Sequence, residues 1–305
     1  MKIALAQMAP VLLDRARTVE KVVSHLRRAA SEGAELVAFG ETLVPGYPVW
    51  IERTDGARFE SSLQKDIYAR YVDQAVEVGA GHLDAVIEAA RELGVYVVLG
   101  TAERDPRRGR SIFASALSIG PKGEILSSHR KLMPTYEERL AWSIGDAHGL
   151  EVHPHGGFRV GALNCWENWM PLARAALYER GETLHVALWP GSPRNTEPVT
   201  RFLAREGRSF VLSVSSVLRG RDVPHDFPHR SAFIRDEDEV LLAGGSCVAG
   251  PDGEWILKPL GEGEERLLYA VLDPTEVDRE RQNFDPAGHY SRPELLALDV
   301  LRTRP

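Results

Sequence analysis

Short apolar segments alternate with helical segments along this chain of 305 residues, and this alternation constrains the fold more than any other feature. The apolar segment KIALAQM is followed by residues with helical spacing of apolar side chains, from Asp14, a predicted helix cap, to Gly33. The apolar run ELVAF comes next. The second half repeats this order with FRVGALN, a predicted helix from Pro171 to Gly181, and LHVALWP. Such alternation is typical of α/β proteins whose helices pack on the outside of a sheet.

Predicted hairpins interrupt this alternation. The segments SIFASALSI and EILSSHRKL are joined by the tight turn Pro121-Lys122-Gly123, which predicts an antiparallel pair. The acidic run RDEDE in SAFIRDEDEVLLAG and the turn Pro251-Asp252-Gly253 are further hairpin signals. The other predicted elements are two helices before a cap at Gly94, the strands VYVVLGTA, FVLSVSSVL and LLYAVLD, a helix over 198–209 and a short last helix. We therefore expect mixed sheets in a single domain over residues 1–305, with a short tail from about residue 285.

The composition excludes several classes of protein. Hydrophobic residues make up 43% of the chain and charged residues 27%, which is typical of a globular protein rather than a disordered or coiled-coil one. The net charge of −7 leaves no basic excess for a nucleic-acid partner. No segment approaches the roughly eighteen apolar residues of a membrane span. Gln7, Pro10 and Asp14 interrupt the first segment before it could act as a signal peptide. We therefore expect a cytoplasmic protein without a membrane partner.

Three reactive side chains directly follow predicted strands. Glu41 follows ELVAFG, Lys131 follows EILSSHR and Cys165 follows FRVGALN. Ligand sites of α/β sheets gather at the carboxyl ends of strands, so these side chains are candidates for one site. A thiol becomes a nucleophile beside a base or a cation, and a lysine can also stabilise negative charge on a substrate. Each residue alone also fits a packing or surface role, so the surrounding sequence has to decide.

The surrounding sequence resembles a known superfamily. The segments GETLVPGYPVW, HRKLMPTYEERLAWSIGD and NCWENWMPLARAALY resemble, in order and spacing, the three signature regions of the nitrilase (carbon–nitrogen hydrolase) superfamily. The Cys-Trp-Glu-Asn segment and the Pro-Gly-Tyr-Pro loop resemble its nitrilase branch. An Asp-Gly pair that commonly ends the second region reads Asp146-Ala147 here, a departure that affects a loop and no catalytic group. The resemblance implies a four-layer α-β-β-α sandwich with two mixed sheets.

The resemblance also implies catalytic roles. Glu41 would act as general base, Lys131 as the cation that stabilises the intermediate and Cys165 as nucleophile. The family has a second glutamate shortly after the lysine, for which Glu138 is the first candidate and the adjacent Glu137 the alternative. Two carboxylates around one ammonium could hold a proton at neutral pH. No metal or other cofactor is implied.

Aromatic residues in or beside the three motifs predict an aromatic substrate pocket. For Trp142 and Trp189, packing in the core is an equally good interpretation. The candidate substrate-binding residues are Tyr47, Thr135, Trp142, Trp166, Trp169, Trp189 and Pro190.

Other potentially reactive residues fit packing or surface roles better than catalytic or metal-binding ones. Two cysteines are too few for a disulfide framework or a thiolate-rich metal site, and Cys247 lies in a segment without a base, so it is predicted to pack in the core. His148, His153 and His155 lack the spacing of a metal site and are predicted to have surface or supporting roles. The sequence also contains neither a Walker A motif nor GxGxxG, so no nucleotide cofactor is indicated.

Three functions are compatible with this sequence. The first is a nitrilase that converts an organic nitrile to the carboxylic acid and ammonia through a covalent cysteine intermediate. The second is an amidase or N-carbamoyl hydrolase with the same four residues, and the third is a catalytically silent member that binds a small molecule or a partner protein. The complete set of Glu41, Lys131, Glu138 and Cys165 argues against the third. The resemblance further implies a homodimer or larger homo-oligomer paired through outer helices, and the short tail before Pro305 favours a dimer or small oligomer.

Overall fold

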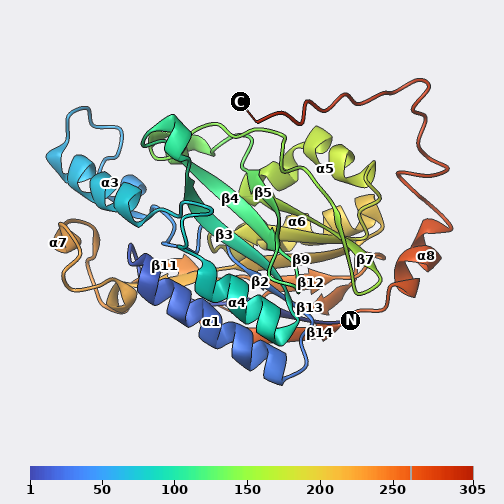
Figure 1. The fold of residues 1–305 in the computed structure, drawn as a ribbon, viewed down its shortest axis with the longest axis horizontal. Helices are drawn as coiled ribbons and strands as arrows, with labels where there is room; N and C mark the ends of the chain where they lie inside the picture. The colour runs from blue at the N-terminus through green and yellow to red at the C-terminus, as the bar shows by residue number, and fades with distance from the viewer. Residues whose placement is uncertain (262, 305) are drawn as a thin grey trace.

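Two six-stranded sheets form the centre of the molecule in a computed structural model that describes residues 1–261 and 263–304 (Figure 1). Pro305, where the predicted tail ends, lies outside the described residues. The first sheet has the order β14-β1-β2-β3-β4-β5 and the second the order β13-β12-β9-β8-β7-β6. A two-stranded sheet pairs β10 with β11.

The first sheet is mixed. Its strands β1, β2 and β3 are parallel, whereas β4, β5 and β14 pair antiparallel to their neighbours. The predicted hairpin around residues 121–123 is confirmed as the pair β4 and β5. The strand bounds are β1 Lys2–Gln7, β2 Leu36–Phe39, β3 Tyr96–Arg104, β4 Ile112–Ile119, β5 Ile125–Arg130 and β14 Arg266–Val271.

The second sheet repeats this plan. Its strands β7, β8 and β9 are parallel, and β6, β12 and β13 are antiparallel to their neighbours. The turn at residues 251–253 joins β12 to β13, as predicted. The strand bounds are β6 His153–His155, β7 Phe158–Asn164, β8 Leu184–Trp189, β9 Phe210–Ser215, β12 Cys247–Ala249 and β13 Trp255–Leu257.

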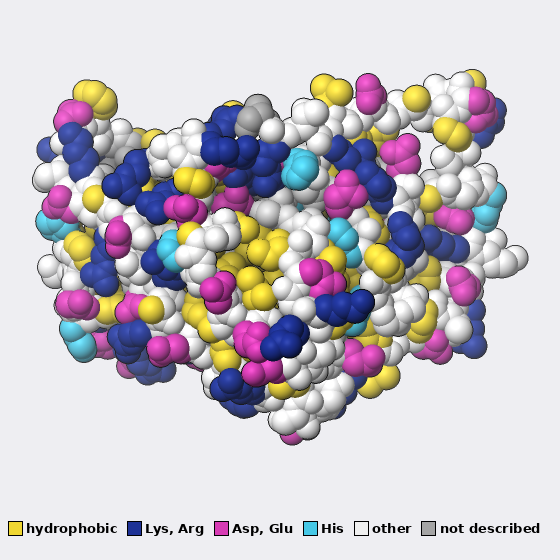
Figure 2. Space-filling view, viewed as in Figure 1, with side chains coloured by type: hydrophobic (Ala, Val, Ile, Leu, Met, Phe, Trp, Pro, Cys, Tyr) yellow, Lys and Arg dark blue, Asp and Glu magenta, His cyan; other side chains and the backbone are white. Residues whose placement is uncertain are grey.

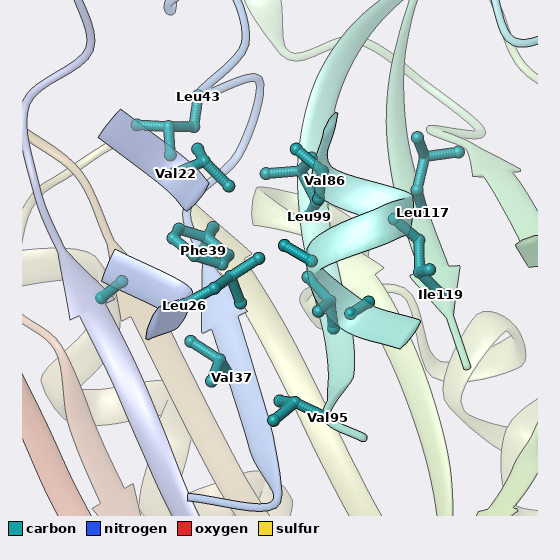
Figure 3. Packing of buried hydrophobic residues seen from close by; sticks show 14 of the residues in the cluster. Val22, Leu26, Val37, Phe39, Leu43, Val86, Val95, Leu99, Leu117 and Ile119 are labelled. Carbon is teal, nitrogen blue, oxygen red and sulfur yellow. The ribbon is translucent and has the colours of Figure 1, made fainter. Parts of the chain in front are cut away.

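Helices cover the outer faces of both sheets. The helices α1 (Arg15–Ser31) and α4 (Asp84–Leu93) pack on the first sheet, where Val22, Leu26 and Val86 meet Phe39 and Leu99 (Figure 3). The helices α5 (Pro171–Tyr178) and α6 (Pro193–Gly207) pack on the second sheet. Between the sheets lies a third apolar layer, in which Leu5 and Val98 face Val186 and Leu212. This arrangement confirms the α-β-β-α sandwich with two mixed sheets.

Local signals determined where two of these helices begin and end. The carboxylate of Asp14 accepts a hydrogen bond from the Arg17 backbone N–H at 3.0 Å, which caps α1 as predicted. Gly94 ends α4 in the left-handed conformation, with φ of 66°, also as predicted. The remaining helices are α2 Trp50–Arg53, α3 Ser62–Gln74, α7 Arg230–Phe233, α8 Thr275–Arg281 and the 3₁₀ turns η1 Pro106–Arg108, η2 Tyr136–Leu140, η3 Cys165–Trp169 and η4 Gly220–Asp222.

Two predicted elements were wrong in their bounds. The helix expected over 198–209 begins at Pro193, because a proline fits the first turn of a helix, and Pro198 lies inside it. The apolar run expected as one strand over 210–218 divides into β9 and β10 (Val217–Arg219).

The hairpin expected within SAFIRDEDEVLLAG is also wrong. Residues 230–233 form α7, and Phe233 is buried against Phe227 instead of pairing in a strand. The strand that follows, β11 (Val240–Ala243), pairs with β10. The local pattern of apolar residues therefore did not reveal that β11 pairs with β10, a strand that precedes α7 in the chain.

The surface and the tail complete the fold. Figure 2 shows acidic and basic side chains mixed over one face, with hydrophobic side chains between them near its centre. In the tail, Leu298 and Val300 pack against the cluster around α5, and the Arg304 guanidinium donates to Asp146 at 3.0 Å. Among the described residues, no helix combines the length and apolar character that a membrane crossing requires.

Candidate active site

The three predicted reactive side chains meet at one edge of the two sheets. Glu41 lies two residues beyond β2, Lys131 directly follows β5 and Cys165 directly follows β7. The backbone N–H of Glu41 donates to the carbonyl of Trp189, the last residue of β8, at 3.1 Å. Because β2 belongs to the first sheet and β8 to the second, this bond joins the two sheets beside the site.

The ammonium of Lys131 lies between two carboxylates. Its Nζ donates to Glu41 Oε1 and to Glu138 Oε2, both at 2.7 Å. All three side chains are buried. Glu138 is therefore the glutamate of the two that contacts Lys131, while Glu137 lies half-exposed in the lining of a neighbouring pocket.

The turn η2 holds Glu138 in place. The backbone N–H of Thr135, at the start of this turn, donates to Glu138 Oε2 at 2.6 Å. The hydroxyl of Tyr47 donates to the other oxygen, Oε1, at 2.9 Å. Glu138 thus accepts hydrogen bonds from three directions, which fixes the carboxylate in one orientation.

The thiol of Cys165 faces these carboxylates. Its Sγ and one carboxylate oxygen each from Glu41 and Glu138 all lie within 4.8 Å of one another. Cys165 has a positive φ of 48°, a conformation that a residue with a side chain adopts at a cost and keeps only where its surroundings enforce it. Such donor atoms could hold a cation, and here the Lys131 ammonium bonds to both carboxylates.

Burial dominates the electrostatics of the site. Burial raises the pKa of Glu41 to about 8, although the charge of Lys131 opposes this shift. Burial likewise raises the pKa of the Cys165 thiol well above its ordinary value, against the opposing effects of Lys131 and the Trp166 backbone N–H. For Lys131 burial acts in the other direction, but the negative charges of Cys165, Glu41 and Glu138 outweigh it and raise its pKa. The site therefore keeps lysine charged and favours a proton on the thiol and on Glu41.

A narrow pocket of about 90 Å³ leads to Glu138 and Tyr47. Tyr47 is the aromatic residue of its lining, and most of the other lining side chains are aliphatic or charged. The lining consists of Tyr47, Pro48, Val49, Ile51, Glu52, Arg53, Glu137, Glu138, Leu241 and Leu242.

The predicted aromatic residues occupy different places around the site. The ring of Trp142 is buried, meets the Tyr47 ring edge-on at 5.5 Å and lies 5.4 Å from Lys131 Nζ. Trp189 is buried in the cluster that contains Cys165 and donates to Ser213 Oγ at 3.2 Å. Trp166 is 51% exposed and Trp169 46% exposed, while Pro190, beyond β8, is half-buried.

Comparisons with known proteins agree with this geometry. A sequence model of the carbon–nitrogen hydrolase family matches residues 2–282. The chain belongs to the carbon–nitrogen hydrolase family. It is 35% identical to an aliphatic nitrilase of Rhodococcus rhodochrous, over 98% of this chain and 82% of the relative. It is 37% identical to an aliphatic nitrilase of Sinorhizobium fredii, over 97% of this chain and 94% of the relative.

The fold of this carbon–nitrogen hydrolase is also similar to solved structures. One is an amidase from Nesterenkonia sp. AN1 carrying the product of Michael addition of acrylamide at its active site cysteine. The TM-score is 0.68 at 21% identity, and the match covers 93% of this chain and 97% of the amidase.

Sequence reasoning missed a second set of buried residues in this hydrolase. The amide of Asn168 donates to the Cys165 carbonyl at 2.8 Å, and its Oδ1 lies 2.7 Å from His185 Nε2. The other ring nitrogen of His185 lies 2.9 Å from Glu182 Oε1. This chain of contacts supports the Cys165 turn from the side of the second sheet. Only one partner of His185 is local, since Glu182 lies three residues earlier, whereas Asn168 comes from another segment 17 residues earlier.

Sequence reasoning also missed Glu167, although a local signal was present. Asn164 and Glu167 have the spacing of a capping box, in which a glutamate accepts from a backbone N–H three residues earlier. The Glu167 carboxylate is buried and also contacts His129.

The residues predicted to have packing, surface or supporting roles make other contacts. Cys247 is buried beside Thr200 Oγ1, and burial raises its thiol pKa to about 12. His153 lies 2.8 Å from Ser127 Oγ, His155 lies 3.0 Å from the Glu35 carbonyl, and His148 lies 3.3 Å from the Arg302 carbonyl.

Proposed function

We propose that this carbon–nitrogen hydrolase is a nitrilase, which converts R–C≡N and two water molecules to R–COOH and ammonia. The observation that carries the proposal is the buried contact of Lys131 with Glu41 and Glu138 beside the Cys165 thiol. A base, a cation and a thiol in one dry site are the parts that nucleophilic attack on a nitrile carbon requires. Full-length similarity to aliphatic nitrilases supports the choice of substrate.

The first half of the reaction forms a covalent intermediate. Glu41 accepts the proton of the Cys165 thiol, and the sulfur attacks the nitrile carbon to form a carbon–sulfur bond. The nitrile nitrogen gains that proton, which leaves a thioimidate, R–C(=NH)–S–Cys165. Lys131 and the backbone N–H of Trp166 stabilise the negative charge that develops on the nitrogen. The Trp166 N–H opposes the rise in the pKa of the Cys165 thiol, in support of this role.

The second half releases both products. Glu41 takes a proton from a water molecule, whose oxygen adds to the thioimidate carbon, and passes this proton to the nitrogen. The hydroxyl proton of the tetrahedral intermediate then moves to the nitrogen through Glu41, the carbon–nitrogen bond breaks and ammonia leaves. The remaining thioester, R–C(=O)–S–Cys165, is attacked by a second water molecule. This step releases the carboxylic acid and returns the proton to the thiol. Glu138 keeps the Lys131 ammonium oriented throughout.

Ammonia release tests the proposed function. We expect turnover of aliphatic nitriles in a panel that also contains aryl nitriles, arylacetonitriles and the matching amides. Incubation with a slow nitrile followed by mass analysis should detect the acyl group on the peptide that contains Cys165. Turnover of amides without nitriles would contradict the nitrilase assignment and favour an amidase or N-carbamoyl hydrolase. Activity retained by Cys165→Ala would overturn the mechanism itself.

We further propose a homodimer or small homo-oligomer of one family domain over residues 1–305, with the tail from about residue 285 on its surface. The exposed side chains Leu172 on α5 and Phe202 on α6 support pairing through these outer helices. Light scattering of the wild type and of Phe202→Glu tests this pairing, since a monomeric wild type would contradict it.

We propose that the protein acts in the cytoplasm, where reducing conditions keep Cys165 as a thiol.

A further inference from the structure

Glu167 connects the two turns that carry Lys131 and Cys165. Its Oε1 accepts from the backbone N–H of Leu132, the residue after Lys131, at 2.6 Å. Its Oε2 accepts from the backbone N–H of Asn164, the residue before Cys165, at 2.9 Å. The two carboxylate oxygens of one side chain therefore bind the neighbours of the two reactive residues.

His129 holds the Glu167 carboxylate from a third side. Its Nε2 lies 2.9 Å from Oε1 and 3.1 Å from Oε2, so the ring N–H donates to both oxygens. Both side chains are buried, with exposures of 2% for His129 and 0% for Glu167. Such a carboxylate, with a donor on each oxygen and a third between them, has one orientation open to it.

We infer that Glu167 is a positioning residue, whose carboxylate sets the distance between the Lys131 ammonium and the Cys165 thiol. This inference rests on the proposed function of these two residues. Lys131 approaches from β5 of the first sheet and Cys165 from β7 of the second, so no hydrogen bond within a single sheet fixes their separation. Glu167 supplies that link through two backbone groups, each one residue away from a reactive side chain.

The hydrogen-bond donors around position 167 require a glutamate rather than a glutamine. A carboxylate offers acceptors on both oxygens, whereas the amide of glutamine offers one acceptor and one N–H₂ donor. In Glu167→Gln the N–H₂ group would face the N–H of either Leu132 or Asn164, and that turn would lose its hydrogen bond. Burial opposes the charge of Glu167, but His129 and the two backbone N–H groups outweigh it and lower its pKa. The carboxylate is therefore the form that fits this position.

The strained backbone of Cys165 gives the link a second role. Its positive φ is maintained by the turn η3, and the bond from Asn164 N–H to Glu167 spans the start of that turn. Loss of this bond would let Cys165 relax toward an ordinary conformation. Sulfur and ammonium would then separate, and the lysine would stabilise the thiolate less.

The decisive test measures chemistry per folded molecule. We expect Glu167→Gln to lower kcat by about 10²-fold, since a displacement of about 1 Å at a reacting group has that effect, with less than about threefold change in KM. Alkylation of Cys165 by iodoacetamide, followed by mass analysis of its peptide, should slow and shift to higher pH. If Glu167 is purely structural, Glu167→Gln would lower the melting temperature and leave kcat and the pH profile of alkylation unchanged. That result would overturn the inference.

A matched variant controls for the loss of a carboxylate. Glu206→Gln makes the same chemical change at a residue that accepts from Arg174 and Tyr178 between α5 and α6. We expect it to retain the wild-type kcat and the wild-type pH profile of alkylation. An equal loss of kcat in Glu206→Gln would show that the effect is not particular to Glu167 and would also overturn the inference.

Substitutions of His129 give an independent route if Glu167→Gln does not fold. His129→Leu removes the donor while leaving both backbone bonds, so we expect a smaller loss of kcat, about tenfold. His129→Gln restores an N–H donor, so its kcat should be close to that of the wild type. Wild-type kcat in His129→Leu would count against the inference. If the wild type hydrolyses no nitrile or amide, the proposed function fails, whereas the alkylation profiles still test the positioning role by themselves.

Discussion

Glu41 and Lys131 are 90 positions apart in the sequence, yet their side chains form a hydrogen bond of 2.7 Å in a site where neither is exposed. Because Lys131 also bonds to Glu138, one positive charge is shared by two carboxylates. An ammonium held in this way cannot give up its proton readily, which suits the charge-stabilising role proposed for it. In the proposed mechanism the proton transfers therefore fall to Glu41 and Cys165.

The two cysteines should differ sharply in function. Cys165→Ala should lower nitrile turnover by at least about 10³-fold, because the nucleophile is lost and no second thiol reaches the site. Cys247→Ala should keep most of the activity, since Cys247 is buried beside Thr200 and is not among the donor atoms that gather at Glu41, Glu138 and Cys165. Steady-state ammonia release measures both. Comparable losses in the two variants would contradict the assignment of Cys165.

Removal of the shared cation should destabilise the fold as well as inactivate the enzyme. Lys131→Met leaves Glu41 and Glu138 buried without their counter-charge, so we expect the free energy of unfolding to fall by about 3 kcal/mol at pH 8. The loss should be smaller at pH 6, where a proton on Glu41 relieves the repulsion. Urea denaturation at both pH values measures it, with the exposed Lys65→Met, which removes the partner of Glu60, as control. A loss equal to that of the control would argue against a strained carboxylate pair.

The raised pKa of Glu41 predicts opposite effects of pH on activity and stability. The base must be ionised, so kcat/KM should fall as the pH drops below about 8. Between its ordinary pKa of 4.5 and about 8, the folded state binds the Glu41 proton more tightly than the unfolded state does. Its contribution to the free energy of unfolding therefore decreases as pH rises through this window, by at most about 1.4 kcal/mol per pH unit.

The variant Glu41→Gln isolates this titration. The difference in the free energy of unfolding between wild type and Glu41→Gln should decline from pH 5 to pH 8. Denaturation at several pH values gives this difference, because the other titrating groups cancel in it. A difference that stays constant, or that grows with pH, would rule out a raised pKa at Glu41.

Tyr47 should act through Glu138. Its hydroxyl donates to Glu138 Oε1 at 2.9 Å, and burial raises the pKa of Tyr47, so it remains a donor at all working pH values. Tyr47→Phe keeps the ring contact with Trp142 and removes this one bond. We expect a loss of about 1 kcal/mol in stability and about tenfold in kcat/KM. Unchanged kinetics would show that the lysine and Thr135 suffice to orient Glu138.

Local sequence determined much of the fold. The caps at Asp14 and Gly94 and the turns at 121–123 and 251–253 are short-range signals, and each produced the predicted boundary. The start of α6 was missed because Pro198 suggested a first turn that Pro193 provides instead. The pairing of β10 with β11 was missed because α7 lies between the two strands in the chain. Strand pairing depends on contacts distant in sequence, which a local pattern does not contain.

For the site, too, local sequence predicted some features and contacts distant in sequence determined the others. The sequence by itself determined the four reactive candidates, since each of Glu41, Lys131 and Cys165 follows a strand inside a recognisable motif and Glu138 follows at a fixed interval. The sequence could not distinguish Glu138 from Glu137 as the second glutamate, because the two residues are adjacent and chemically identical. Only the tertiary structure distinguishes them, because the η2 turn places the Glu138 carboxylate on Lys131 and leaves Glu137 half-exposed. Only the structure revealed that His129 and Glu167 join the turns of the two sheets, because a buried hydrogen-bond network is a property of packed elements and not of any one segment.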